Sequence, residues 1–202
     1  MLNRNNRPGH ALGLLLLLLA SVPAVAAQEW ITLTPAGEGF SVRLPSKPRE
    51  EAGKTPILGN NYLMKLYAVV SEPNHVLYMA VMQEFPAAAV ATIKPAERLD
   101  QFMSGFREGF LKDLTAACPN VDLHLERELT LKDRPGREYS ISCKNLYGLI
   151  RVFDNETRLY VLLAAAHDER EAGPTKFLQS FELLPAPLPV ALPKSETKSS
   201  QD

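Results

Sequence analysis

The chain has 202 residues, with 22 Lys and Arg against 23 Asp and Glu, and a formal net charge of −1 at pH 7. This balance argues against a nucleic-acid partner, which would require a basic face, and against a membrane binder held by charge alone. The length favours one domain that can bury a normal core without metals or many crosslinks.

Residues 1–27 have the pattern of a secretory signal peptide. Arg4 and Arg7 precede a Leu-rich apolar run over 11–20, and Ala24-Val25-Ala26 fits a cleavage site. The alternative is a membrane anchor, but the run is only about half of the ~20 residues that span a bilayer. We therefore expect export to the periplasm or the extracellular space, with no transmembrane segment after cleavage.

The first strands are predicted by alternation and by turn residues. Residues 30–34 and 40–44 flank a turn that contains Pro and Gly, which predicts a hairpin. The polar stretch 46–56 predicts a loop. Two longer strands are expected over 62–70 and 76–85, joined by a turn.

A helix is predicted over 95–117. Pro95 is tolerated in a first helical turn, and large apolar residues then recur at three- and four-residue steps, so that they share one face. These residues are Leu99, Phe102, Met103, Phe106, Phe110 and Leu114. The helix should lay this face on a sheet.

The second half reads as a strand meander closed by a short helix. Apolar alternation over 121–131 is broken at Arg127, which predicts a bulge or a strand end there. Three strands follow within 137–166, and the helix over 174–181 can lay its Phe and Leu residues on the sheet. Residues 159–166 are apolar at every position, as expected for a strand that is covered on both faces.

These elements predict a single α+β domain over residues 28–184. Its expected fold is a mainly antiparallel sheet of about six to eight strands covered on both faces by helices, an α/β/α sandwich. Residues 185–202 are Pro-rich and then wholly polar, and they predict a disordered tail that would act as a spacer.

The order of these parts resembles the PsbP-like superfamily, and the chain is similar to its small exported bacterial members. The resemblance rests on GFSVRLPSKP at 39–48, RPGREYSISC at 134–143, RVFDNETRLYVLLAAA at 151–166 and KFLQSFEL at 176–183. It implies an antiparallel sheet between helical layers. Because the photosynthetic members are extrinsic subunits that help to assemble or stabilise a membrane complex, it also implies a non-enzymatic accessory role. No metal or docking residue of the superfamily is matched here.

Two cysteines, Cys118 and Cys143, would meet an oxidising compartment after export, so we predict a disulfide between them. The alternative is a pair of buried thiols, since Cys is among the most buried residue types. A redox enzyme would need a C-x-x-C pair, which the sequence lacks.

The sequence offers few candidate site residues. His124 shares a predicted strand face with Glu126 and Glu128, which permits a metal site, although an exposed polar face is the simpler interpretation. The cluster 167–171 permits a weak metal or acid–base site, or a solvated loop. No catalytic motif occurs, so an enzyme is not expected, and no cofactor or metal is expected.

Arg151, Arg158 and Tyr160 lie on adjacent predicted strands and are the candidate contact points for a partner. The alternative is that the two Arg residues cover sheet edges with their stems.

Two functions follow from these observations. We expect a non-catalytic exported binding or assembly module of an envelope or membrane-associated complex, with a protein partner. The alternative is a carrier of a small apolar ligand held between helix 95–117 and the sheet. Such a carrier would need a cavity lined by Phe102, Phe106, Tyr62 or Met64.

Overall fold

The computed structural model describes residues 29–57, 60–72, 75–106, 121–143, 146–167 and 172–185. The predicted signal peptide and nearly all of the predicted tail lie outside these residues. The elements in chain order are β1 (Ile31–Leu33), β2 (Phe40–Leu44), β3 (Arg49–Ile57), β4 (Asn60–Ser71), β5 (Val76–Glu84), α2 (Ala87–Thr92), α3 (Pro95–Phe106), β6 (Asp122–Leu131), β7 (Arg134–Cys143), β8 (Leu146–Asn155), β9 (Arg158–Ala166), α5 (Ala172–Gln179) and β10 (Glu182–Leu183).

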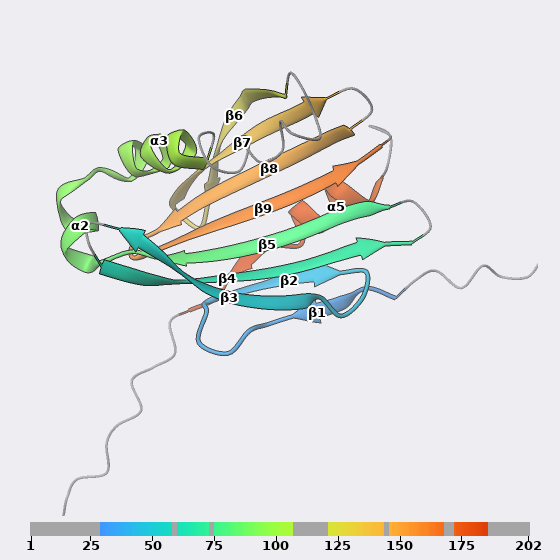
Figure 1. Ribbon diagram of the computed structural model, residues 1–202, viewed down its shortest axis with the longest axis horizontal. Coiled ribbons are helices and arrows are strands. Elements are labelled where there is room, and N and C mark those ends of the chain that lie inside the picture. The colour runs from blue at the N-terminus through green and yellow to red at the C-terminus, as the bar shows by residue number, and fades with distance from the viewer. Residues whose placement is uncertain are drawn as a thin grey trace, which may run out of the picture.

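The main sheet has seven antiparallel strands in the order β3-β4-β5-β9-β8-β7-β6 (Figure 1). It consists of two meanders, β3–β5 and β6–β9, which meet where β5 pairs with β9. Tight turns set the register, because Lys132 and Asp133 both have positive φ and close a two-residue hairpin between β6 and β7. Every strand pairing in this sheet is antiparallel.

A second, three-stranded sheet has the order β1-β2-β10. The predicted N-terminal hairpin is confirmed, since β1 pairs with β2 from Ile31 opposite Leu44 to Leu33 opposite Val42. The other edge of β2 pairs with β10, and Leu184 N–H donates to Gly39 O at 2.9 Å. The small sheet thus joins the two ends of the described chain.

The central strand β9 contributes to two separate cores. Tyr160, Leu162, Ala164 and Ala166 belong to one buried cluster, together with residues of β2, β5, α5 and β10. The alternate residues of β9, from Leu159 to Ala165, belong to a second cluster that includes residues of α3, β7 and β8. The prediction that residues 159–166 are covered on both faces is confirmed.

The expected α/β/α sandwich is wrong, because one covering layer is mainly a sheet. The small sheet and α5 cover one face of the main sheet, and we call this the small-sheet face. Phe40, Val42 and Leu44 of β2 are fully buried there. The opposite face, which we call the α3 face, is contacted by α3 over β7 and β8 (Figure 1). The apolar alternation of β2 predicted a half-buried strand, but it did not indicate that this strand packs on the main sheet.

The predicted loop over residues 46–56 is also wrong, because Arg49–Ile57 forms the edge strand β3. Its register runs from Arg49 opposite Ala68 to Ile57 opposite Asn60. An edge strand is held by backbone hydrogen bonds and can keep polar side chains, which protect the edge from further pairing. Charged residues and a proline therefore occur within a real strand.

Helix α3 is fixed to the main sheet by a buried ion pair. Arg98 is paired with Asp154 of β8 through both carboxylate oxygens. Its Nη1 also donates to Val90 O at 2.9 Å and to Ile93 O at 2.7 Å. One guanidinium group therefore ties α2 and α3 to β8. Of the predicted helix over 95–117, residues 107–117 lie outside the described part.

Candidate functional site

The three predicted contact residues all project onto the small-sheet face, but they make internal contacts there. Tyr160 is 1% exposed and its hydroxyl donates to Glu38 O at 2.7 Å. Arg151 donates to Glu138 and to Leu178 O, and Arg158 lies 3.5 Å from Glu84. The structure therefore does not gather them into one open cluster, and their role in a partner contact stays a prediction.

Glu138 is the centre of a charged cluster on this face. Its Oε1 accepts from Arg127 Nε at 2.8 Å and its Oε2 accepts from Arg151 Nε at 2.6 Å. Burial raises the pKa of Glu138, but the hydrogen bonds from Arg151 and Arg127 outweigh this effect, and the pKa is held below its ordinary value. The cluster links β6, β7 and β8, and Arg151 extends it to α5.

The lowered pKa of Glu138 predicts an acid-dependent loss of stability. A group whose pKa is lowered by folding stabilises the fold above its unfolded pKa, and this contribution is lost as pH falls through the folded pKa. Wild type should exceed Glu138→Gln in unfolding free energy by roughly 1–3 kcal/mol at about pH 7. The difference should shrink below about pH 4.5, the ordinary pKa of this carboxyl. Urea unfolding of both proteins across this range measures it.

Comparing the two proteins removes the contribution of other groups. Burial raises the pKa of Asp154, while Arg98 opposes this rise, so the contribution of Asp154 to the unfolding free energy changes with pH in the opposite direction. Both proteins share this contribution, and it cancels when their unfolding free energies are subtracted. An unfolding difference that stays constant from about pH 7 to about pH 3 would contradict the role of Glu138.

A second polar cluster, which the sequence did not predict, surrounds Glu38. This side chain is 3% exposed, and its Oε1 accepts from Tyr67 Oη at 2.6 Å and Lys65 Nζ at 2.6 Å. Burial and the hydrogen bond to Glu38 raise the pKa of Tyr67 well above its ordinary value. The cluster fixes the turn before β2, where Gly39 has a φ of 72° and an added Cβ would lie 3.1 Å from Tyr160 Oη.

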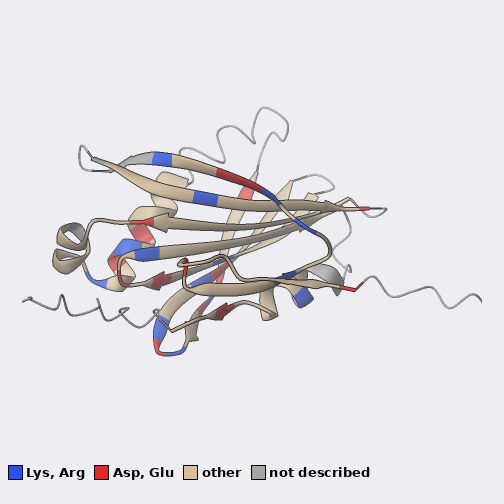
Figure 2. Cartoon of the chain, turned by 90° about the horizontal axis from the view of Figure 1, so that it is seen from below, with Lys and Arg blue, Asp and Glu red and all other residues tan. Residues whose placement is uncertain are grey.

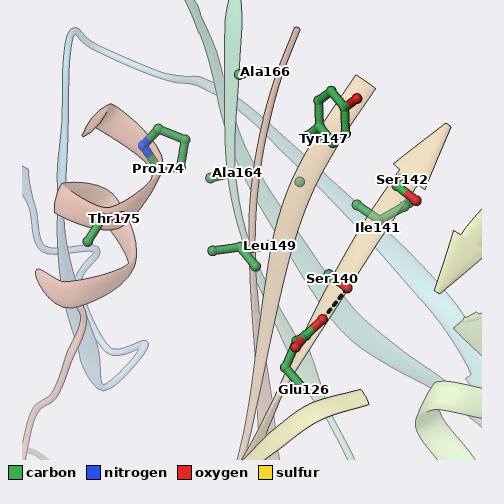
Figure 3. A pocket seen from close by; sticks show the side chains of 11 residues that line it. Glu126, Ser140, Ile141, Ser142, Tyr147, Leu149, Ala164, Ala166, Pro174 and Thr175 are labelled. Carbon is green, nitrogen blue, oxygen red and sulfur yellow. Dashed lines mark hydrogen bonds between the residues drawn. The ribbon is translucent and has the colours of Figure 1, made fainter. Parts of the chain in front are cut away.

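One open feature of this face is a pocket of about 400 Å³ between β6–β9 and α5 (Figure 3). Two rows of neighbouring side chains line its floor: Ser142, Tyr147 and Ala166, then Ser140, Leu149 and Ala164. Pro174 and Thr175 of α5 form the facing wall, and Glu126, in the middle of β6, lies beside Ser140 (Figure 3). The pocket therefore combines a narrow apolar floor with hydroxyl groups and one carboxylate.

A β-bulge aims Glu126 at the pocket. The register of β6 against β7 shifts between Leu125 and Arg127, so the predicted irregularity at Arg127 is confirmed. Ser140 Oγ donates to Glu126 Oε1 at 2.5 Å, while Arg127 bonds Glu138 on the same face. A bulge allows two consecutive residues to project to one side of a strand, and bulges often re-aim functional side chains.

The bulge also separates the acids that the sequence placed beside His124. His124 is opposite Ser140 on the small-sheet face, whereas Glu128 is opposite Arg137 and approaches its Nε at 4.0 Å. Within the described ranges no group of three His, Cys, Asp or Glu side chains could hold a metal ion. Of the cluster 167–171, only His167 is described, and it is exposed.

The predicted disulfide falls partly outside the described residues. Cys143 ends β7 and is buried on the α3 face, while Cys118 is not among the described residues. The pairing therefore stays a prediction. The predicted ligand site of the carrier also lies on the α3 face, where Leu99 and Met103 are buried and Phe102 stacks on Phe106 with ring centroids 6.1 Å apart.

Comparison with solved structures identifies the fold. The solution structure of cyanobacterial PsbP (CyanoP) from Synechocystis sp. PCC 6803 matches with a TM-score of 0.51 and 12% sequence identity, over 82% of this chain and 99% of that chain. This chain has a PsbP-like fold. The resemblance to the PsbP-like superfamily is therefore confirmed for the fold, although one face is covered mainly by a sheet and not by the helical layer that the resemblance implied. At 12% identity the match carries no site residue.

Other comparisons add no relative. No family model and no curated protein sequence matches the chain. Among the described residues, no helix of this PsbP-like fold is both long and apolar enough to cross a membrane. Functional assignment therefore depends on the pocket and its surroundings.

Proposed function

We propose that the chain is an exported, non-catalytic binding module that docks a protein partner of an envelope complex through the pocket on its small-sheet face. The observation that carries this proposal is the half-open pocket lined by Glu126, Ser140, Ser142, Tyr147 and Thr175. Its lining comes from four neighbouring strands and one helix, so its shape is set by the rigid sheet. The N-terminal signal pattern over 1–27 supports export.

The distribution of charged groups supports a binding role over catalysis. Lys and Arg are interspersed with Asp and Glu over the described chain (Figure 2). The buried acids Glu138, Asp154 and Glu38 each have a cationic partner within the fold. A catalytic centre typically leaves a perturbed acid or base open to a cleft. The pocket instead presents hydroxyl groups and a single carboxylate.

The PsbP-like fold supports an accessory role by resemblance. The superfamily that the sequence resembles includes extrinsic subunits of a membrane complex, and the module proposed here would act in the same general way. The tail over 185–202 would then serve as the spacer between the docked domain and its surroundings. The disulfide Cys118–Cys143 would secure the strand β7 that carries Ser140 and Ser142 after export.

A pocket-blocking substitution tests the proposal. Ser142→Arg places a long, charged side chain in the pocket, and the matched variant Thr130→Arg places the same side chain at an exposed site farther along β6. Tagged wild-type and variant proteins are incubated with an envelope extract, and retained proteins are quantified by mass spectrometry. One partner should be retained by wild type and Thr130→Arg, and its yield should fall about tenfold with Ser142→Arg.

Retention of the same proteins in equal amounts by all three forms would contradict docking through the pocket. Circular dichroism and thermal unfolding of each variant establish that the comparison concerns folded proteins.

The carrier hypothesis is the second candidate, because a pocket of about 400 Å³ falls within the size range of ligand sites. This pocket lies on the opposite face from α3 and has a carboxylate at its rim, so it suits an apolar ligand poorly. Native mass spectrometry of the mature protein distinguishes the two, since a carrier should retain a bound mass of a few hundred daltons.

A further inference from the structure

We infer that the pocket accepts a basic side chain, Lys or Arg, of the docked partner, with its cationic group on Glu126 and its aliphatic stem on the floor of the pocket. The inference rests on the proposed docking function and adds the chemistry of the group that is recognised. It is carried by the charges, the hydrogen bonds and the shape of the pocket.

The charges that line the pocket favour a cation. Glu126 is the only ionisable carboxylate among the described lining residues, and none of them is Lys, Arg or His. Asp122 occupies the register position opposite Ser142 on the same face, so a second carboxylate lies beside the rim. An anionic ligand would meet these two carboxylates, whereas a cation would meet an acceptor, and His124, which is opposite Ser140 on the same face, does not line the pocket.

The hydrogen bonds of Glu126 leave it able to bind a cation. Its Oε1 accepts from Ser140 Oγ at 2.5 Å, which orients the carboxylate. A carboxylate has two oxygens and accepts several hydrogen bonds, so a donor from an ammonium or guanidinium group can be added. The hydroxyls of Ser142, Tyr147 and Thr175 also line the pocket and offer further acceptors for the remaining N–H groups.

The neighbouring arginines do not occupy this acceptor. Arg127 and Arg151 direct their Nε groups to the two oxygens of Glu138, and Arg151 Nη1 donates to Leu178 O at 3.0 Å. These two cations and the carboxylates of Glu138 and Glu126 balance in charge. The bulge keeps Arg127 away from Glu126, because it presents Glu126 to the pocket and Arg127 to Glu138.

The floor fits a narrow aliphatic stem. Ala164 and Ala166, at the C-terminal end of β9, present small side chains to the pocket, and Leu149 of β8 lies between the two alanines and β7. Lys and Arg are the side chains that bury such a stem while keeping the charge at the rim.

Amide NMR titration tests this chemistry with defined probes. Nα-acetyl-lysine methylamide is the ligand, and Nα-acetyl-norleucine methylamide is its neutral match. The lysine probe should shift the amides of Ser140, Ser142, Ala164 and Thr175 and bind about fivefold more tightly than the norleucine probe, as for a half-exposed ion pair. Added salt should weaken binding of the lysine probe alone.

Two variants assign the effect to Glu126. Glu126→Gln should reduce affinity for the lysine probe about fivefold and leave the norleucine probe unchanged. Glu128→Gln, which removes the next acid of β6 on the α3 face, should change neither. Equal affinities for the two probes, shifts confined to another face, no shifts at all, or an unaltered Glu126→Gln variant would each overturn the inference.

The outcomes separate this inference from the function on which it rests. If the lysine probe fails while Ser142→Arg still abolishes partner retention, docking through the pocket stands and the recognition of a basic side chain is wrong. If the probe binds at Glu126 but retention is unaffected by Ser142→Arg, the pocket recognises a cation that does not belong to the retained partner, and the inference as stated fails.

Discussion

Replacing Asp154 with alanine should lower the free energy of unfolding by about 3–5 kcal/mol, the range expected when one partner of a buried ion pair is removed. The side chain of Asp154 is 4% exposed and that of Arg98 is 12% exposed. Without the carboxylate, the Arg98 guanidinium stays buried with only the carbonyl oxygens of Val90 and Ile93 as partners. Thermal or urea unfolding of the purified domain measures the loss.

A nearby exposed pair provides the control for Asp154. Arg134 Nη2 and Glu156 Oε1 are 2.6 Å apart, with side chains that are 39% and 69% exposed. Glu156→Gln should change the unfolding free energy by less than about 1 kcal/mol, because exposed ion pairs contribute little. Similar losses for Asp154→Ala and Glu156→Gln would show that Arg98 and Asp154 do not hold α2 and α3 onto the sheet.

Replacing Phe177 with alanine should cost about 3–5 kcal/mol, as for other large-to-small substitutions of core aromatic residues. Phe177 is fully buried on the small-sheet face, and its ring centroid is 5.4 Å from that of Tyr78. The substitution would leave a cavity between α5 and β5, since the neighbouring rings are held by their own contacts. Because α5 also forms a wall of the pocket, partner retention should fall together with stability.

The matched variant is Gln179→Ala on the exposed side of the same helix. It should change stability by less than about 0.5 kcal/mol, the usual range for surface substitutions. If Phe177→Ala were as stable as Gln179→Ala, the packing of α5 on the main sheet would not be as described.

The central strand could be predicted from the sequence because an unbroken run of apolar residues indicates that both sides of a strand are buried. Residues 159–166 are apolar throughout, and β9 is covered on both faces. The helix near the C-terminus was likewise marked by Phe177, Leu178 and Phe181, which are all buried. In both cases the number of apolar residues and their spacing determine which sides are covered.

The layers could not be predicted, because alternation does not reveal what a strand packs against. The hairpin of β1 and β2 was expected, yet its position over the main sheet depends on β10, which pairs with β2 from more than a hundred residues away in the sequence. Strand β3 was missed for a different reason. Its pairing with β4 is made by the backbone, and its side chains remain polar at the sheet edge.

The pocket was missed because its residues meet only through strand register. Ser140, Leu149 and Ala164 lie on three strands, and no local motif connects them. A usable signal was present in β7, where Glu138, Ser140 and Ser142 alternate with apolar residues and so mark a polar strip on one face. The bulge at Arg127 was predicted, but its effect on the direction of Glu126 depends on the fold.

Site-specific photocrosslinking in the source organism tests whether the pocket docks a protein partner. A photoreactive benzoylphenylalanine is placed at Thr175, in the pocket wall, or at Lys54, an exposed site on the far edge strand β3. We expect a crosslink to one protein from position 175, none to that protein from position 54, and loss of the crosslink when Ser142→Arg is added. A crosslink from position 54 alone, or one from position 175 that Ser142→Arg leaves unchanged, would contradict docking through this pocket.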